Sequence, residues 1–223
     1  MPTREVLQGD GLAWLRQQQL TETHALVTSL PDVSELPQLG FDGWRSWFIE
    51  TSALVCERSH ERGVSVFFQT DIKREGAWVD KAYLVQRGAE QAGVTLLWHK
   101  VVCRKPPGTT SFGRPAFAHV LCFSRLMRLP SSASSPDVLP SLGQMPWSRA
   151  MGVEVCDFVC RFLQAHTSTR TVVDPFCGQG TVLAVANRHG LDAVGVELSR
   201  KRAKRARNLQ LDDWAAGAQR PSI

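Results

Sequence analysis

The sequence of 223 residues lacks the features that mark membrane-spanning and secreted proteins. No apolar run approaches the length needed to cross a bilayer, and residues 1–5 lack the basic-then-apolar pattern of a signal peptide. Both absences favour a cytoplasmic protein that does not bind membranes.

The spacing expected of a metal site is missing as well. The six cysteines include no Cys-x-x-Cys pair, and most of them lie in apolar runs such as Leu121–Phe123. The six histidines show no ligand spacing either. This distribution favours small buried side chains in a reducing compartment over zinc ligands or disulfides, and we predict no metal.

The sequence does have an excess of positive charge. Lys and Arg number 26 against 21 Asp and Glu, which gives a net charge of +5. Much of the excess lies in one stretch that comprises Arg200, Lys201, Arg202, Lys204, Arg205 and Arg207. On a helix, residues 200, 201, 204 and 205 share a face. A solvated helix face is the ordinary interpretation, and a phosphate-contacting patch is the alternative.

Hydrophobic patterning predicts one α/β domain over residues 1–223. With 43% hydrophobic residues, a chain of this length can bury a substantial core. Helices are expected at about 11–18, 44–58, 80–92, 150–165 and 181–189, and strands at 23–28, 63–71, 94–102, 116–123, 171–174 and 193–197. Such alternation predicts a mainly parallel sheet covered by helices on both faces, with 94–102 and 116–123 as an antiparallel pair.

Two long stretches rich in Pro, Ser and Gly interrupt this pattern, at about 104–115 and 129–146. Loops of this length in a compact domain are commonly functional. We therefore expect them to act as lids over a substrate.

The segment Asp174–Thr181 reads Asp-Pro-Phe-Cys-Gly-Gln-Gly-Thr and lies between a β-branched strand and a helix. A strand, a glycine loop and a helix in this order cradle adenosine-type cofactors. Gly178 and Gly180 let the backbone turn sharply and approach a ligand closely, because neither carries a Cβ. Asp174 ends its strand at the edge where open α/β sheets bind ligands.

Glu197 ends the next predicted strand, about twenty residues on, where an acidic side chain can accept hydrogen bonds from ribose hydroxyls. Leu183 stands where a dinucleotide fingerprint would have its third glycine, and no Gly-Lys-Ser/Thr follows. The loop therefore differs from the usual NAD and P-loop motifs.

Together with Val194–Glu197, the segment Asp174–Thr181 closely resembles motifs of the amino-group methyltransferases, which methylate exocyclic nitrogens of bases in DNA or RNA. The resemblance implies a Rossmann-like class I methyltransferase fold, with a mostly parallel seven-stranded sheet. It also implies S-adenosyl-L-methionine as the cofactor. An ordinary buried strand and turn is the alternative, which so many matching positions disfavour.

The family's second signature, Asp/Asn/Ser-Pro-Pro-aromatic, holds the amino group that is methylated. Its counterpart here is Ser29, Leu30, Pro31 and Asp32, after the strand 23–28. Leu30 replaces the first proline, and Asp32 replaces the aromatic that would stack on the base. Asp32 could accept a proton or hydrogen bond from the amine, or it could cap the next helix. Stacking would then fall to another aromatic, for which Trp44, Trp47 and Phe112 are candidates.

This signature precedes the cofactor loop, an order that resembles the circularly permuted β class of the family. The resemblance covers the whole chain, closely at 171–198 and loosely elsewhere. It assigns cofactor contacts to Gly9, Asp10, Ser29, Trp147, Ser148, Arg149, Asp174, Pro175, Phe176, Gly178, Gly180, Thr181, Glu197 and Leu198. Substrate contacts are expected from Asp71, Lys73, Arg104, Lys105 and Arg114, and Arg125 and Arg128 would extend a basic rim. For Asp71 and Lys73, a salt-bridged loop is the alternative.

Methyl transfer requires an amine lone pair held in line with the methyl carbon, in a site that excludes water. Ser29 and the Leu30 carbonyl are the predicted orienting acceptors, and Asp32 is the predicted proton acceptor. The chain has little room for a separate target-reading region, which favours RNA, recognised by shape or single strands, over DNA as the nucleic-acid partner. DNA N4-cytosine or N6-adenine methylation is the first alternative. An inactive methyltransferase fold that serves in binding or assembly is the second.

Overall fold

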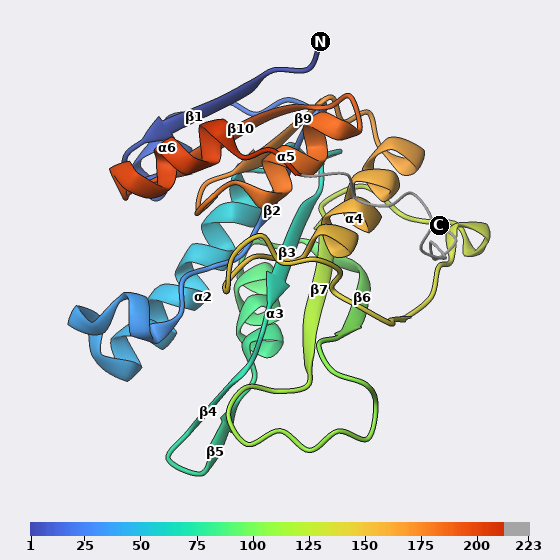
Figure 1. Ribbon diagram of the computed structural model, residues 1–223. Helices are drawn as coiled ribbons and strands as arrows, with labels where there is room; N and C mark the ends of the chain where they lie inside the picture. Colours follow the sequence, from blue (N-terminus) through green and yellow to red (C-terminus); the bar gives the residue numbers. More distant parts are fainter. Residues whose placement is uncertain (212–223) are drawn as a thin grey trace.

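The computed structural model describes residues 1–211, and the last part of the predicted domain, residues 212–223, lies outside the described residues. The main element is an eight-stranded sheet (Figure 1). In spatial order its strands are β1 (Arg4–Gln8), β10 (Asp192–Glu197), β9 (Thr171–Asp174), β2 (His24–Thr28), β3 (Ser65–Gln69), β7 (Phe117–Ser124), β6 (Thr95–Cys103) and β8 (Val138–Leu139).

The first five strands of this order run parallel to one another. Strand β7 is antiparallel to both of its neighbours, β3 and β6, and the short strand β8 pairs parallel to β6. Parallel strands end at one edge of the sheet, so the turns that follow β1, β10, β9, β2 and β3 lie together.

Helices cover both faces of the sheet (Figure 1). Helices α1 (Gly11–Gln17), α2 (Gly40–Arg58) and α3 (Lys81–Gln91) bury Leu15, Trp44, Phe48 and Leu84 on one face. Helices α4 (Val153–His166), α5 (Thr181–Arg188) and α6 (Arg200–Asn208) pack a second apolar cluster on the other face. Successive residues of β3 serve the two clusters in turn: Phe67 belongs to the first and Phe68 to the second.

This architecture confirms the predicted fold class, including the antiparallel pair, with one short strand beyond the seven expected. Strand β1 was not predicted from the sequence because Val6 is its one buried residue, so it shows no clear hydrophobic pattern. The hairpin of β4 (Ile72–Arg74) and β5 (Ala77–Val79) also escaped prediction. Its turn places Glu75 at φ 51° before Gly76, where Asn or Asp is the usual signal.

The remaining elements are short 3₁₀ turns at Val33–Glu35, Pro37–Leu39 and Ser131–Ala133. Helix α2 starts at Gly40, earlier than expected, and α4 starts at Val153, later than expected. Within residues 1–211, no helix is long and apolar enough to cross a membrane. The cysteines of the described chain are unpaired thiols, and five of the six are buried.

Candidate functional site

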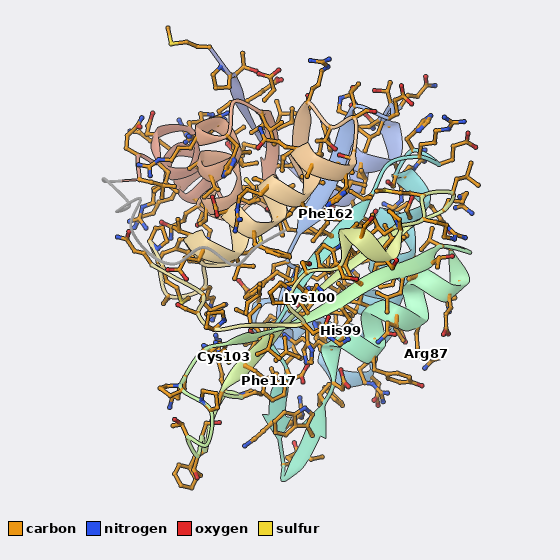
Figure 2. The ribbon with its side chains drawn as sticks, turned by 90° about the vertical axis from the view of Figure 1, so that its right-hand side faces the viewer. Arg87, His99, Lys100, Cys103, Phe117 and Phe162 are labelled. Carbon is orange, nitrogen blue, oxygen red and sulfur yellow. The ribbon has the colours of Figure 1, made fainter. Side chains whose placement is uncertain are left out.

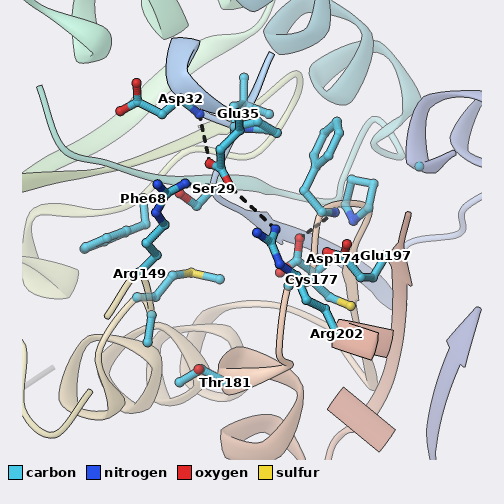
Figure 3. A pocket seen from close by; sticks show the side chains of 18 of the residues that line it. Ser29, Asp32, Glu35, Phe68, Arg149, Asp174, Cys177, Thr181, Glu197 and Arg202 are labelled. Atoms are coloured by element: carbon cyan, nitrogen blue, oxygen red, sulfur yellow. Dashed lines mark hydrogen bonds and ion pairs between the residues drawn. The ribbon is translucent and has the colours of Figure 1, made fainter. Parts of the chain in front are cut away.

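A cavity of about 580 Å³ opens at the edge where the parallel strands end. It lies within the range typical of small-molecule sites. The turns after all five parallel strands contribute to its wall, as do residues 142–151 and the side chains of Lys81, Arg104 and Arg114. The cavity is shown from close by in Figure 3.

Asp174 carries an unsatisfied acceptor at this cavity. Its side chain is fully buried, and its Oδ1 accepts hydrogen bonds from Thr28 Oγ1 at 2.6 Å and from the Phe176 amide at 3.0 Å. Oδ2 has no hydrogen-bond partner among the described residues. Burial raises the pKa of Asp174 to about 7. A buried carboxyl with a free oxygen suits a cationic hydrogen-bond donor, whose charge would stabilise the ionised form.

The loop after Asp174 approaches the cavity without side chains. Gly178 and Gly180 have φ values of +56° and +83°, in the region that favours glycine. A Cβ on Gly178 would come within 2.9 Å of the Trp147 ring. Trp147 Nε1 in turn donates to Thr181 Oγ1 at 3.2 Å. The structure therefore brings the segment 147–149, for which the family resemblance predicts a cofactor contact, against the glycine loop.

Glu197 lies beside this loop, and the Gly178 amide is one of the backbone donors to its carboxylate. Its Oε1 accepts the Ser199 amide at 2.7 Å, and its backbone carbonyl accepts the Gly9 amide at 3.1 Å. Burial raises the pKa of Glu197. The next residue, Leu198, lines the cavity with 74% of its surface exposed, which suits contact with an apolar ligand surface. Asp10 also borders the cavity, where its carboxylate caps α1 through the Leu12 and Ala13 amides.

The turn Ser29–Asp32 forms a second wall of the cavity beside the first, because β2 and β9 are neighbours in the sheet. Trp44 Nε1 donates to the Pro31 carbonyl at 3.1 Å, and the Leu30 side chain is buried. Within residues 1–211, neither Ser29 Oγ nor the Leu30 carbonyl has a hydrogen-bond partner. Both remain available to accept a hydrogen bond from an amine, the role that the sequence predicts for them.

Of the two roles that the sequence leaves open for Asp32, the structure shows the cap. It caps the 3₁₀ turn Val33–Glu35, with its Oδ1 at 3.4 Å from the Ser34 amide, and it also lines the cavity. Its Oδ2 lies 3.0 Å from the Lys81 ammonium. Burial alone would raise the pKa of Asp32, but Lys81 and the backbone donor hold it below its usual value. A carboxylate stabilised in this way is a weak proton acceptor, so the geometry favours a positioning role.

Glu35 connects three parts of the cavity wall and was not predicted from the sequence. Its Oε2 accepts the Asp32 amide at 3.2 Å. Its Oε1 lies 2.9 Å from Arg149 and 3.4 Å from Arg202 (Figure 3). The signal that could have found it is the capping-box spacing Asp-x-x-Glu at residues 32–35. Glu35 thereby joins the Ser29–Asp32 turn to the segment 147–149 and to α6.

The predicted substrate residues divide into two groups. Arg104 and Arg114 line the cavity from close to the two ends of the loop 104–116, which meet at its root. That root is fixed by the Arg104 amide, which donates to the Ala116 carbonyl at 2.7 Å, and Figure 2 shows Cys103 and Phe117 on either side of it. Lys73 and Lys105 are not among the lining residues. Lys73 instead donates to the Ser111 carbonyl at 2.8 Å.

Asp71 has a structural role behind the cavity. Its buried carboxylate accepts the Lys81 amide at 2.8 Å, Trp78 Nε1 at 2.9 Å and His119 Nε2 at 3.0 Å. Together with Asp80 and His119 it forms a group of side chains of the kind that can bind a metal ion. Because these three contacts occupy both Asp71 oxygens, the group anchors the hairpin β4–β5 and the start of α3.

Of the three aromatics predicted to stack on a base, Trp47 is the one that lines the cavity. Trp44 is fully buried beneath the Ser29–Asp32 turn, and Phe112 is 90% exposed on the loop 104–116. The predicted rim residues Arg125 and Arg128 do not line the cavity and contact backbone carbonyls of residues 93, 125 and 127. On α6, Arg202 points to Glu35, whereas Arg207 donates to the Val6 carbonyl.

Two buried polar residues of the wall, Gln69 and Lys81, were not predicted from the sequence. Gln69 ends β3 and Lys81 begins α3. Lys and Gln are usually exposed, so only the three-dimensional packing reveals their position.

Neither a protein-family model nor a curated protein matches the sequence. Solved structures do match the fold. TTHA0409 of Thermus thermophilus, a candidate DNA modification methylase solved with S-adenosyl-L-methionine, has a TM-score of 0.69 and 21% identity over 92% of this chain and 93% of that one. The cytosine-N4-specific PvuII DNA methyltransferase has a TM-score of 0.66 and 17% identity over 95% of this chain and 88% of that one. M1.HpyAVI, solved with S-adenosyl-L-methionine, has a TM-score of 0.59 and 15% identity over 94% of this chain and 100% of that one.

These likenesses extend over nearly the whole chain, so the resemblance seen in the motifs is matched by the fold. At these identities they establish a class I, Rossmann-like methyltransferase architecture. Activity and substrate have to be argued from the site itself.

Proposed function

We propose that this protein is an S-adenosyl-L-methionine-dependent methyltransferase that acts on an exocyclic amino group of a base in DNA. The observation that carries the proposal is one cavity between two walls. One wall holds the unsatisfied Asp174 and the glycine loop, and the other holds the free acceptors of Ser29 and Leu30. A cofactor site and an amine site therefore open into the same space.

The residues of the first wall fit the proposed cofactor. Asp174 Oδ2 would accept a hydrogen bond from the ammonium of its methionine part, and the Glu197 carboxylate would accept from its ribose hydroxyls. Exposed Leu198 and Phe176 offer apolar surface to its adenine. Bound there, the cofactor supplies an activated methyl group on a sulfonium.

The residues of the second wall hold the amine and need not react covalently. Ser29 Oγ and the Leu30 carbonyl accept from the amino group and direct its lone pair, while Trp47 offers the ring against which a base can pack. A base inside a duplex must leave the stack to reach them. The Arg104 and Arg114 side chains at the mouth add positive charge for the phosphate backbone.

The choice of DNA departs from the RNA predicted by the sequence. That prediction depended on the small size of the chain. TTHA0409, a candidate DNA modification methylase, is covered over 93% of its own length by this chain, so a chain of comparable size is associated with DNA. The three structural neighbours named above supply no corresponding support for RNA, and the DNA alternative is therefore preferred.

The proposed substrate class can be tested by labelling. The purified protein is incubated with S-adenosyl-L-methionine carrying a labelled methyl group, together with unmethylated DNA, total RNA and protein in separate reactions. We expect label in DNA. Label confined to RNA or protein would refute the proposed substrate, and cofactor binding without any transfer would indicate an inactive fold.

The affinity for S-adenosyl-L-methionine should depend on pH through Asp174. Because its pKa is raised to about 7, the carboxyl of the free protein is neutral at lower pH and must lose its proton to pair with an ammonium. We expect the dissociation constant to rise about tenfold per pH unit below pH 7, to be lowest just above it, and to rise again above about pH 8 as the cofactor's α-amino group loses its proton. Calorimetric titrations between about pH 5.5 and pH 8.5 measure this dependence, and a flat profile would contradict the assigned contact.

A further inference from the structure

Lys81 presents an incompletely paired ammonium to the second wall of the cavity. The residue is 3% exposed and begins α3. Its Nζ donates to Asp32 Oδ2 at 3.0 Å and lies 5.6 Å from the centre of the Trp44 ring. An ammonium carries three N–H donors. Among the described residues, Asp32 is the one hydrogen-bond acceptor of this group, so donors remain for a ligand.

Gln69 presents a second unsatisfied group. The residue is 1% exposed, lines the cavity at the end of β3, and has no hydrogen-bond partner for Nε2 within residues 1–211. Its side chain follows Phe67 by two residues and so lies on the same face of the sheet, the face that packs against α2 and α3. Lys81 belongs to that face as well. A buried amide nitrogen without a partner lowers the stability of the folded protein. A ligand that accepts a hydrogen bond from this nitrogen would explain why the residue is there.

The surrounding charges leave this part of the wall donor-rich. Asp32 balances Lys81, while Arg114 lies close enough to interact with both charges. The family resemblance places an aromatic side chain at position 32, where this chain has Asp32 paired with Lys81. Where the family pattern has a flat aromatic ring facing the base, this protein has N–H donors.

We propose that Gln69 and Lys81 form a reading wall, which donates hydrogen bonds to the ring edge of the target base and so favours cytosine over adenine. The proposal depends on the function proposed above. A flipped base is read along the edge that also carries its amino group. In cytosine the amine is followed on that edge by two acceptors, N3 and O2. In adenine it is followed by one acceptor, N1, and then by a C–H group, which cannot use a second donor.

The test uses Gln69→Leu, Lys81→Met and Lys81→Arg, with Gln164→Leu and Lys100→Met as matched controls. Gln164 is an exposed glutamine that pairs with His189 outside the cavity. Lys100, labelled in Figure 2, is a buried lysine on β6 that pairs with Asp137. Each protein is assayed for kcat and KM on duplex DNA whose only methylatable base is cytosine or adenine. Cofactor affinity and Tm are measured alongside.

We expect wild-type transfer to cytosine in preference to adenine. Gln69→Leu and Lys81→Met should each lower kcat/KM on cytosine about tenfold or more, with cofactor affinity unchanged. Lys81→Arg, which keeps the charge, should recover part of the loss. Because Gln69→Leu removes a buried unsatisfied amide, its Tm should rise by about 2–4 °C while its activity falls, a combination that a purely structural role does not predict. The two control variants should keep wild-type kcat/KM.

A substrate analogue gives an independent measure of the contact. With 3-deazacytosine, whose ring lacks the N3 acceptor, the loss caused by Gln69→Leu or by Lys81→Met should shrink, because one partner is already absent. Wild-type kcat/KM on cytosine in both variants would overturn the reading wall, as would a wild-type preference for adenine, and either result would leave the proposed function intact. Absence of transfer to any DNA by the wild-type protein would overturn both.

Discussion

Asp174→Asn should weaken binding of S-adenosyl-L-methionine on the order of 100-fold, because a buried charged pair loses one partner. The substitution keeps an oxygen to accept from Thr28 Oγ1 and the Phe176 amide, so the loop itself should persist. The substitution removes the negative charge at Asp174 Oδ2, the oxygen that has no hydrogen-bond partner within residues 1–211. Calorimetric titration of the two proteins at about pH 8 measures the loss.

Stability separates this effect from simple unfolding. The pKa of Asp174 in the folded protein, about 7, lies above that of an unfolded aspartate, so ionisation at pH 8 opposes folding. This destabilisation is absent below the unfolded pKa and grows as pH rises towards 7. The neutral Asn variant should therefore have a Tm at pH 8 at least as high as that of the wild type.

A matched control is Asp157→Asn on α4. Asp157 is also buried, but its carboxylate pairs with Arg161 at 3.0 Å and His189 at 2.8 Å, away from the cavity. This variant should lose stability and keep its cofactor affinity. Equal affinity of Asp174→Asn and wild type would remove Asp174 from the cofactor site.

Asp32→Ala should reduce methyl transfer below about one hundredth of the wild-type rate, while cofactor binding persists. The substitution removes the cap of the 3₁₀ turn and leaves the Lys81 ammonium buried without its carboxylate. Loss of one partner of a buried ion pair costs about 3 kcal/mol or more of unfolding free energy. Movement of the Ser29–Asp32 turn by even 1 Å is enough to cost on the order of 100-fold in rate. Single-turnover rates and calorimetry measure the two effects separately.

The double variant Asp32→Leu/Lys81→Met distinguishes lost stability from lost function. Replacing both charges by apolar side chains leaves no unpaired ion, so the Tm should return towards that of the wild type. Transfer should stay low, because the turn has lost its cap and the wall its ammonium. Restored transfer in the double variant would show that the pair contributes stability alone.

The wall proposed to hold the cofactor could be predicted because the backbone conformation that it needs is set by local residues. The loop Asp174–Thr181 needs glycines with positive φ at positions 178 and 180, and the sequence states those requirements directly. The acid at the end of the following strand, Glu197, has a fixed spacing from the loop. The hydrogen bond between Trp147 and Thr181, which joins two distant segments, was not predicted from the sequence.

The wall proposed to hold the substrate was harder to predict because it depends on packing between distant elements. Lys81 looks like an ordinary exposed lysine at the start of a helix, and only the approach of α3 to the Ser29–Asp32 turn buries it. Asp71 looks like a substrate contact at a strand end, yet His119 from β7 and Trp78 from β5 occupy its carboxylate. No pattern in the neighbouring sequence predicts that Lys81 pairs with Asp32, or that Asp71 pairs with His119 and Trp78.

Helical phase could have separated two of the aromatic candidates. Trp44 and Phe48 lie four residues apart on the buried stripe of α2, next to each other at 5.2 Å between ring centres. Trp47 lies on an adjoining face, where its ring meets Phe176 of the cofactor loop. The period of 3.6 residues therefore distinguishes a core residue from a cavity residue.

The identity of the methylated nucleoside tests the central claim most directly. Unmethylated duplex DNA is incubated with the protein and S-adenosyl-L-methionine labelled in its methyl group, digested to nucleosides and analysed by mass spectrometry. We predict that the label is found on an exocyclic nitrogen, as N4-methylcytosine, and that it is lost with Asp174→Asn at a cofactor concentration that saturates the wild type. Label on a ring carbon, or no labelled nucleoside while the cofactor binds normally, would contradict the proposed function.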